Sequence, residues 1–457
     1  MVEIIKYQGF DHIWQYSGPW LYYLLAIYVS LPVLAYKVLP YLFLKKRSHH
    51  NRRKSVLIFV LGDLGHSPRM CYHALSFSQL EYNVNLCGYV ETRPLDKIVD
   101  DINIEITPIE VVKNSENLPF VLFAAKKIIL QVSQVARILY KYRDDTDFVM
   151  IQNPPSIPIL LVVIFFKILA DRQLKIIIDW HNLNYTILNM RFQNFNNWLV
   201  RWARAYEKFL ARFASLNITV TKKMKSFLVE EFQLDKGKVT TLYDKPGPQF
   251  QPVNDKKILY SHELVQGIDN IEHYKVLVSA TSFTPDEDFS ILLNALKLYE
   301  KETKSPPVLL IVTGKGPLKT DFLQMVENLK FSPSKVVVRT AWLTSEEYPK
   351  ILASADLGIS LHTSSSGIDL PMKIVDFFGC GIPVVSLNFP AIDELVKDGE
   401  NGLVAENSTS DEVCSLLTQA FTDDKLLKHL KMGAIDESKS RWNENWIRVL
   451  QPKFENS

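Results

Sequence analysis

The stretch SSSGIDLPMKIVDFFGCGIPVVSL, residues 364–387, contains a loop, a helix and a strand in succession. It opens with small polar residues, continues with apolar residues at helical spacing in PMKIVDFFG, and ends in the β-branched run PVVSL. Strand-like runs precede it at 275–282, 308–313 and 355–362, with helical stretches between them. Because parallel strands need long crossover connections, this alternation predicts a doubly wound parallel α/β sheet.

The first half of the chain shows the same alternation. VLIFVL (56–61), VNLCGYV (84–90), FVMIQ (148–152) and IIIDW (176–180) are strand-like runs separated by helical stretches. The polar, proline-containing stretch 243–272 has the composition of a linker. The sequence therefore predicts two Rossmann-like doubly wound domains that face a cleft, where ligands bind at the carboxyl ends of the strands.

Residues 20–44, WLYYLLAIYVSLPVLAYKVLPYLFL, carry a single charge, Lys37. As a helix this run spans about 37 Å, enough to cross the ~30 Å hydrocarbon core of a bilayer. The following KKRSHHNRRK, residues 45–54, contains six Lys or Arg and no acid, which favours the cytosolic side. We predict an N-terminal transmembrane helix; a cleaved signal peptide and a buried soluble helix are the alternatives.

The composition excludes several classes of protein. Of 457 residues, 47% are hydrophobic and 22% are charged, which is typical of a folded globular protein and not of a disordered one. A net charge of +2 provides no overall field for nucleic acid, so we expect no nucleic-acid partner. Four cysteines without a CxxC pair favour a reducing compartment and argue against a disulfide framework or a metal site.

The 364–387 stretch resembles the nucleotide-sugar signature of GT-B glycosyltransferases, in which a helix bearing Lys and an acid precedes G-x-P-V-V. GDLGHSPRM (62–70), DWHN (179–182), SATSFTPDEDF (279–289) and VTGKGPLK (312–319) occur in the order of one family. With these motifs and the anchor, the whole chain resembles the membrane-bound GT-B glycosyltransferases that add the first mannose to dolichol-linked chitobiose.

The resemblance implies the GT-B fold, GDP-mannose as donor, GlcNAc2-PP-dolichol as acceptor and inverting formation of a β-1,4 linkage. It implies a single-pass enzyme of the endoplasmic reticulum membrane with cytosolic catalytic domains. No tightly bound cofactor is implied, while stimulation by a divalent cation and association with other mannosyltransferases of the pathway stay open. The alternatives are another membrane-associated GT-B transferase with a different donor or acceptor, and a non-catalytic GT-B scaffold subunit.

These expectations assign a role to each part of the chain. Residues 1–54 form a lumenal stub, the anchor and a basic cytosolic collar, and 55–245 form the acceptor- and membrane-facing domain. Residues 272–425 form the nucleotide-sugar-binding domain, and 426–457 form helices that can cross back to the first domain. We expect the apolar stretches 118–130 and 157–168 to hold the first domain against the bilayer.

The resemblance places the donor on the second domain. The acidic residue of the signature, Asp376, binds both ribose hydroxyls, which one carboxylate can accept together. Lys373 then supplies a cation to the diphosphate, and loop amides beside a helix N-terminus favour phosphate; a solvated Lys–Asp helix pair is the alternative. Inversion fits because Ile368 stands where many retaining relatives carry a glutamate, eight residues before Asp376. The predicted donor-binding residues are Asp376, Lys373, Gly314, Lys315, Gly316, Ser366, Gly367 and Asp369, with Trp342 and Leu343 in the guanine pocket, where relatives bind the base through backbone groups.

An inverting transfer needs a general base beside the acceptor hydroxyl. GDLGHSPR places Asp63 and His66 in the loop after the first strand. Histidine suits proton transfer near neutral pH, whereas Asp63 would need desolvation, and the sequence leaves the choice between them open. The predicted acceptor-binding residues are Gly65, Arg69, His181 and Asn182. An exposed helix arginine is the alternative for Arg69, and a packed, hydrogen-bonded histidine is the alternative for His181.

Overall fold

The computed structural model describes residues 52–114, 117–253 and 256–455, together with four isolated positions between 23 and 30. The predicted transmembrane helix at 20–44 therefore lies almost entirely outside the described residues. Within the described part, no helix combines the length and the hydrophobicity needed to cross a bilayer.

The first domain is built on a seven-stranded sheet in the order β3-β2-β1-β4-β5-β6-β7, and every neighbouring pair is parallel. Alternate residues of β1 enter two separate hydrophobic clusters, one on each face of the sheet. Burial on both faces explains why the strand is a continuous apolar run. The strands are β1 (Ser55–Asp63), β2 (Asn83–Tyr89), β3 (Ile104–Pro108), β4 (Phe148–Asn153), β5 (Lys175–Trp180), β6 (Leu216–Thr219) and β7 (Val239–Thr241).

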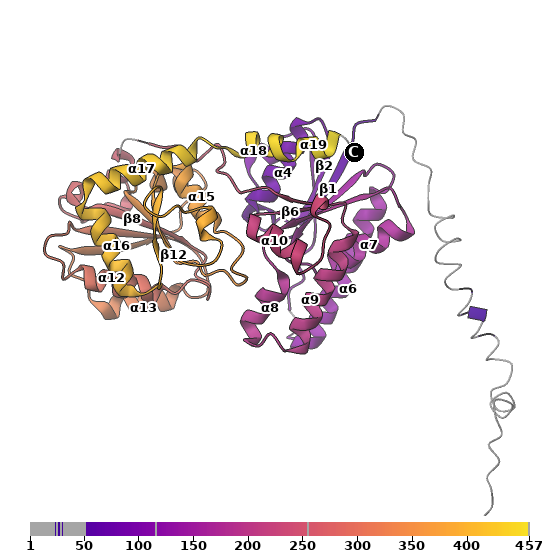
Figure 1. The fold of residues 1–457 in the computed structure, drawn as a ribbon, viewed down its shortest axis with the longest axis horizontal. Coiled ribbons are helices and arrows are strands. Elements are labelled where there is room, and N and C mark those ends of the chain that lie inside the picture. The colour runs from indigo at the N-terminus through magenta and orange to yellow at the C-terminus, as the bar shows by residue number, and fades with distance from the viewer. Residues whose placement is uncertain are drawn as a thin grey trace, which may run out of the picture.

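Helices cover both faces of this sheet (Figure 1). The chain reverses its direction of winding at β1, because β2 and β4 lie on either side of it. Such a switch point is where open parallel sheets bind ligands. The short helix η2 (Leu64–His66) starts directly there. The main helices are α4 (Pro68–Gln79), α6 (Phe120–Lys141), α7 (Ile159–Leu169), α8 (Asn184–Phe192), α9 (Trp198–Leu210) and α10 (Lys222–Glu230).

The second domain repeats this design with a six-stranded parallel sheet in the order β10-β9-β8-β11-β12-β13, whose switch point lies between β8 and β11. The strands are β8 (Lys275–Thr281), β9 (Val308–Gly314), β10 (Val336–Ala341), β11 (Leu357–Ser360), β12 (Val384–Leu387) and β13 (Gly402–Ala405). The main helices are α12 (Phe289–Tyr299), α13 (Lys319–Leu329), α14 (Glu347–Ala353), α15 (Met372–Gly379), α16 (Ser410–Thr422) and α17 (Asp424–Ser438).

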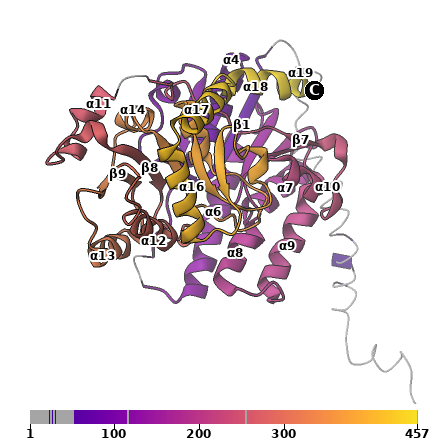
Figure 2. The same cartoon turned by 60° about the vertical axis from the view of Figure 1, so that its left-hand side comes forward.

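The C-terminal helices α18 (Trp442–Val449) and α19 (Gln451–Glu455) return to the first domain and lie beside α4 (Figures 1 and 2). The indole N–H of the fully buried Trp446 donates to His73 Nδ1 at 2.9 Å. Its ring lies 5.2 Å from that of Phe77 on α4. The chain end thus completes the hydrophobic core of the opposite domain.

The two domains also touch at the carboxyl edges of their sheets. Thr221, after β6, donates its hydroxyl to the carbonyl of Ile368, after β11, at 2.6 Å. The first two amides of α10, at Lys222 and Lys223, donate to the carboxylate of Glu394 at 2.7 and 2.8 Å. The loops that follow the strands of both sheets therefore face each other.

Candidate active site

The loop after β1 holds a carboxylate–imidazole pair. Asp63, the last residue of β1, lies 2.9 Å from His66 Nδ1 and also accepts the backbone amides of Glu91 and Thr92 and the Thr92 hydroxyl. Burial alone would raise the pKa of Asp63, but the bonds from Thr92 and Glu91 hold it below the usual value. Asp63 thus stays ionised, while the His66 side chain is 61% exposed.

Gly65 lies against the loop that follows β2. A Cβ atom at this position would stand 2.2 Å from Thr92 Oγ1. The packing of the two loops accounts for a glycine here, and its contact with the acceptor stays a prediction.

The structure contradicts both expectations for Arg69. The side chain is 1% exposed, and its Nε and Nη2 donate to the two carboxylate oxygens of Asp179 at 2.8 and 2.9 Å. Its Nη1 donates to Asp244 at 2.7 Å and to the carbonyl of Leu242. Arg69 is therefore neither an exposed helix arginine nor placed to touch a lipid pyrophosphate, because protein carboxylates surround its guanidinium.

His181 shares the carboxylate of Asp179. Its Nε2 lies 2.7 Å from Asp179 Oδ2, and His73 Nε2 lies 3.3 Å from the same oxygen. Burial would raise the pKa of Asp179, but Arg69 and the two imidazoles hold it well below the usual value. His181 is thus hydrogen-bonded to Asp179 and keeps 23% exposure of its side chain at the end of β5, and a contact with the acceptor stays a prediction.

Asn182 reaches into the second domain. Its amide donates to Ser365 Oγ and to Asp369 Oδ2, both at 3.2 Å. The residue therefore joins the loop after β5 to the loop after β11, and a contact with the acceptor stays a prediction.

The loop 364–369 folds around the buried carboxylate of Asp369. The hydroxyls of Ser364 and Ser366 donate to Asp369 Oδ1, and the amide of Gly367 donates to Ser364 Oγ at 2.7 Å. Gly367 has a φ of +74°, which a glycine adopts without strain. Internal hydrogen bonds thus hold this loop, and the donor contacts of Ser366, Gly367 and Asp369 stay predictions.

Lys373 and Asp376 lie on α15 and have different partners. Lys373 Nζ lies 2.7 Å from the carboxylate of Glu287, which also accepts the hydroxyl of Thr281. Asp376 is half-buried and accepts the Tyr348 hydroxyl at 3.2 Å. The alternative of a solvated Lys–Asp pair on one helix is therefore wrong.

The segment after β9 packs tightly on the segment after β8. Cβ atoms at Gly314 and Gly316 would lie 1.8 and 1.7 Å from the carbonyl oxygens of Thr281 and Ser282. This close backbone approach explains both glycines, so they are not by themselves evidence of a phosphate loop. Lys315, between them, extends over the indole ring of Trp342.

The predicted guanine pocket contains one exposed and one buried side chain. The indole of Trp342 is 52% exposed and lies 4.2 Å from Lys315 Nζ, which is a cation–π distance. Leu343, in contrast, is 9% exposed and belongs to the hydrophobic core of the second domain. Its side chain therefore packs in the core, and binding of the base through backbone groups at this position stays a prediction.

Comparison with known proteins identifies the family. Residues 274–423 match the family described as Glycosyl transferases group 1. The chain is 64% identical over 460 residues to the Chitobiosyldiphosphodolichol beta-mannosyltransferase of Candida albicans, with 100% of both chains covered. The protein of that name from Homo sapiens is 34% identical, with 87% of this chain and 92% of that protein covered. The chain belongs to the chitobiosyldiphosphodolichol beta-mannosyltransferase family.

Solved structures confirm the predicted fold for this beta-mannosyltransferase family member. Sucrose-phosphate synthase from Thermosynechococcus elongatus superposes with a TM-score of 0.66 at 12% identity, covering 89% of this chain and 98% of that one. HepE from Anabaena gives a TM-score of 0.64 at 16% identity, covering 89% and 99%. The enzyme is thus a glycosyltransferase with the two-domain GT-B fold.

One group in this beta-mannosyltransferase family member was missed by sequence reasoning. His362, two residues after β11, lies with its Nδ1 3.4 Å from Asp286 and its Nε2 3.5 Å from Asp369. Burial lowers the pKa of His362, but the two carboxylates outweigh it and raise the pKa to about 9. The imidazole is therefore a cation at neutral pH. His362 is the last residue of the strand-like run ADLGISLH (355–362). A position at the end of a strand was the signal that selected His66, and it was also available for His362.

In the part of the chain that the structure describes, no group of three or more His, Cys, Asp or Glu side chains is arranged to hold a metal ion.

Proposed function

We propose that this glycosyltransferase transfers mannose from GDP-mannose to the outer sugar of GlcNAc2-PP-dolichol and forms a β-1,4 linkage with inversion. The full-length 64% identity to a protein named Chitobiosyldiphosphodolichol beta-mannosyltransferase carries the proposal. The Asp63–His66 pair supports it, because an inverting transfer needs a base on the acceptor side.

In the proposed reaction, the acceptor hydroxyl gives its proton to His66 Nε2 while its oxygen forms a bond to the mannose C1 atom. The bond between C1 and the diphosphate oxygen breaks on the opposite face, and GDP leaves with the bonding electrons. Asp63, 2.9 Å from Nδ1, favours the tautomer with its proton on Nδ1 and stabilises the imidazolium that forms. His66 is thus the base and Asp63 its positioning residue.

For the donor, we assign the ribose to Asp376 and the diphosphate to Lys373. Glu287 and Tyr348 support this assignment, since each holds one of these side chains in place from another element of the second domain. We keep the predicted donor-binding roles of Gly314, Lys315, Gly316, Ser366, Gly367, Asp369 and Trp342. For Leu343 we keep only a role of its backbone. We assign no tightly bound cofactor and leave stimulation by divalent cations to experiment.

Purified full-length protein incubated with a panel of nucleotide sugars and a lipid-pyrophosphate chitobiose tests the function. We expect product from GDP-mannose alone, with the mannose in the β configuration. An α product, or use of a different sugar nucleotide, would favour another GT-B transferase. Absence of any product under conditions in which the donor binds would favour a scaffold subunit.

Donor binding should depend on pH through Asp376. Burial above all, with a contribution from the charge of Asp244, raises the pKa of Asp376 to about 8. Only the ionised carboxylate accepts both ribose hydroxyls, and each pH unit below the pKa costs about 1.4 kcal/mol. The dissociation constant of GDP should therefore fall as pH rises and level off above about 8.

Calorimetric titration with GDP between about pH 7 and about pH 9 measures this dependence. Asp376→Asn should bind GDP at least about tenfold more weakly and without the pH dependence. The exposed Asp411→Asn is the matched control and should behave as the wild type. A pH dependence that survives in Asp376→Asn would assign it to another group.

We further propose that the enzyme acts at the cytosolic face of the endoplasmic reticulum membrane, with residues 1–44 as lumenal stub and anchor. Large apolar side chains on two helices of the first domain support membrane contact. Leu161 and Phe165 on α7, and Trp198, Trp202 and Phe209 on α9, are all exposed. Indole rings are favoured at the membrane–water interface.

Deletion of residues 1–44 should leave GDP-mannose binding unchanged and weaken the use of long-chain lipid acceptors. The reason is that the anchor raises the concentration of the domains at the surface where the acceptor lies. The measurement is the rate of mannose transfer in proteoliposomes, with a water-soluble short-chain acceptor as control. Equal rates of the truncated and full-length proteins in membranes would contradict a role for the anchor.

A further inference from the structure

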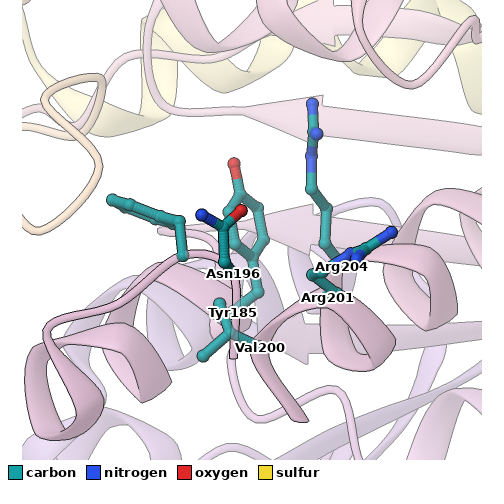
Figure 3. Close-up of a pocket in the computed structure, with 6 residues that line it drawn as sticks. Tyr185, Asn196, Val200, Arg201 and Arg204 are labelled. Atoms are coloured by element: carbon teal, nitrogen blue, oxygen red, sulfur yellow. The ribbon is translucent and has the colours of Figure 1, made fainter. Parts of the chain in front are cut away.

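A pocket of about 340 Å³ opens in the first domain between α8 and α9, and the proposed reaction does not use it. It is lined by Tyr185, Phe195, Asn196, Val200, Arg201 and Arg204. Figure 3 shows the Tyr185 hydroxyl and the Arg204 guanidinium extending in the same direction from the two neighbouring helices. The pocket thus combines aromatic walls with two guanidinium groups.

The charges of this pocket suit an anion. Arg204 pairs with the exposed Glu231 at 2.8 Å, a surface contact that contributes little and that an incoming anion can replace. The one acid on α9 itself, Glu207, is buried and accepts the amides of Asn184 and Tyr185 at 2.9 and 3.2 Å. Glu207 therefore ties α9 to the start of α8 and holds the pocket walls together.

The two helices that line the pocket also carry exposed apolar side chains and an interdomain contact. Trp198 and Trp202 of α9 have 71% and 50% of their surface exposed. α8 begins four residues after Trp180, the last residue of β5, and its Thr186 contacts Ser365 of the second domain at 3.1 Å. A ligand bound in the pocket therefore lies beside both the loop after β5 and an apolar surface.

We propose that this pocket binds the pyrophosphate of the lipid acceptor. Two guanidinium groups match the geometry of phosphate oxygens, and the exposed indoles beside them suit the isoprenoid chain at the bilayer surface. In this arrangement the attached sugars run along the carboxyl edge of the sheet, on which the loops after β5 and β1 both lie, with β4 between those two strands. This inference rests on the proposed function and names the acceptor site that Arg69 does not provide.

The test uses full-length protein in detergent micelles and a phytanyl-pyrophosphate chitobiose acceptor. The double variant Arg201→Gln/Arg204→Gln should raise the KM for this acceptor at least about tenfold, because charge-assisted phosphate contacts are lost. Its kcat and its KM for GDP-mannose should stay within about twofold of the wild type, since both arginines lie on α9 of the first domain and the predicted donor residues lie in the second. Arg201→Gln alone changes only an exposed side chain and should give part of the same effect.

The matched control is Lys208→Gln/Arg212→Gln, which removes the same charge farther along the same segment. Its KM for the acceptor should not change. An equal rise of KM in both double variants would mean that diffuse electrostatic attraction, and not the pocket, holds the acceptor. An unchanged KM in Arg201→Gln/Arg204→Gln would overturn the proposal.

Binding of phytanyl pyrophosphate, followed by tryptophan fluorescence, separates this inference from the proposed function. We expect binding to the wild type that weakens at least about tenfold in Arg201→Gln/Arg204→Gln. Equal binding of phytanyl phosphate, of inorganic pyrophosphate or of anionic phospholipid vesicles would mean a general anion site and would contradict a pyrophosphate pocket. If the wild type transfers no mannose but this binding pattern holds, the proposed function fails while the pyrophosphate site stands.

Discussion

His66→Ala should lower kcat for mannose transfer by about 10²–10⁴-fold, the usual contribution of a positioned general base. The KM for GDP-mannose should change little, because His66 lies in the first domain and the predicted donor residues lie in the second. We expect the loss of kcat because His66 can act as a base: Asp63 keeps a carboxylate at Nδ1, and Nε2 belongs to an exposed side chain.

Three variants measured together make this result interpretable. Asp63→Asn should lower kcat less than His66→Ala does, because the imidazole remains but loses its orienting carboxylate. His273→Ala, at an exposed histidine remote from the loop after β1, should keep full activity. Full turnover by His66→Ala would place the base elsewhere and would leave the Asp63–His66 pair a structural feature of the loop.

Arg69→Met should lower the free energy of unfolding by about 3–5 kcal/mol, which is the usual cost of leaving buried charges without their partner. In the wild type, Arg69 neutralises Asp179 and Asp244 inside the protein. Without the guanidinium, both carboxylates face each other in a buried site. The thermal unfolding midpoint of the full-length protein in detergent measures the loss.

The loss of unfolding free energy in Arg69→Met should also depend on pH. In the wild type the pKa of Asp179 is held well below its usual value, so its stabilising contribution is present at neutral pH and is lost only as pH falls toward that low pKa. In Arg69→Met the same carboxyl has a raised pKa and becomes neutral on mild acidification. The difference between variant and wild type should therefore shrink as pH falls.

The exposed Arg93–Asp96 pair provides the control for this variant. Arg93→Met removes an ion pair between two mostly exposed side chains and should change stability by less than about 1 kcal/mol. An equally small effect of Arg69→Met would contradict the assignment of the buried cluster as a stabilising contact. It would then reopen a functional role for Arg69.

Local sequence predicted those parts of the protein that depend on neighbouring residues. The alternation of apolar strands and helices predicted both parallel sheets, because strands buried on both faces are continuous apolar runs. Residues directly after a strand, such as His66 and Asn182, were correctly placed at the sheet edge. Asp63, which pairs with His66 three residues later, was also predicted to lie in the same loop.

Partners that are distant in the chain were beyond such reasoning. Arg69 bonds to carboxylates 110 and 175 positions away, and nothing in its neighbourhood along the chain distinguishes it from a surface arginine. Leu343 and His362 each follow a strand, yet one side chain packs into the core and the other stands between two carboxylates.

The sequence by itself therefore determined the two-domain fold, the family and the loops that carry the chemistry. Only the tertiary structure decided which side chains in those loops are buried among protein partners and which are exposed to a substrate. The physical reason is that burial and charge pairing depend on elements from distant parts of the chain, which local periodicity and motif spacing do not describe.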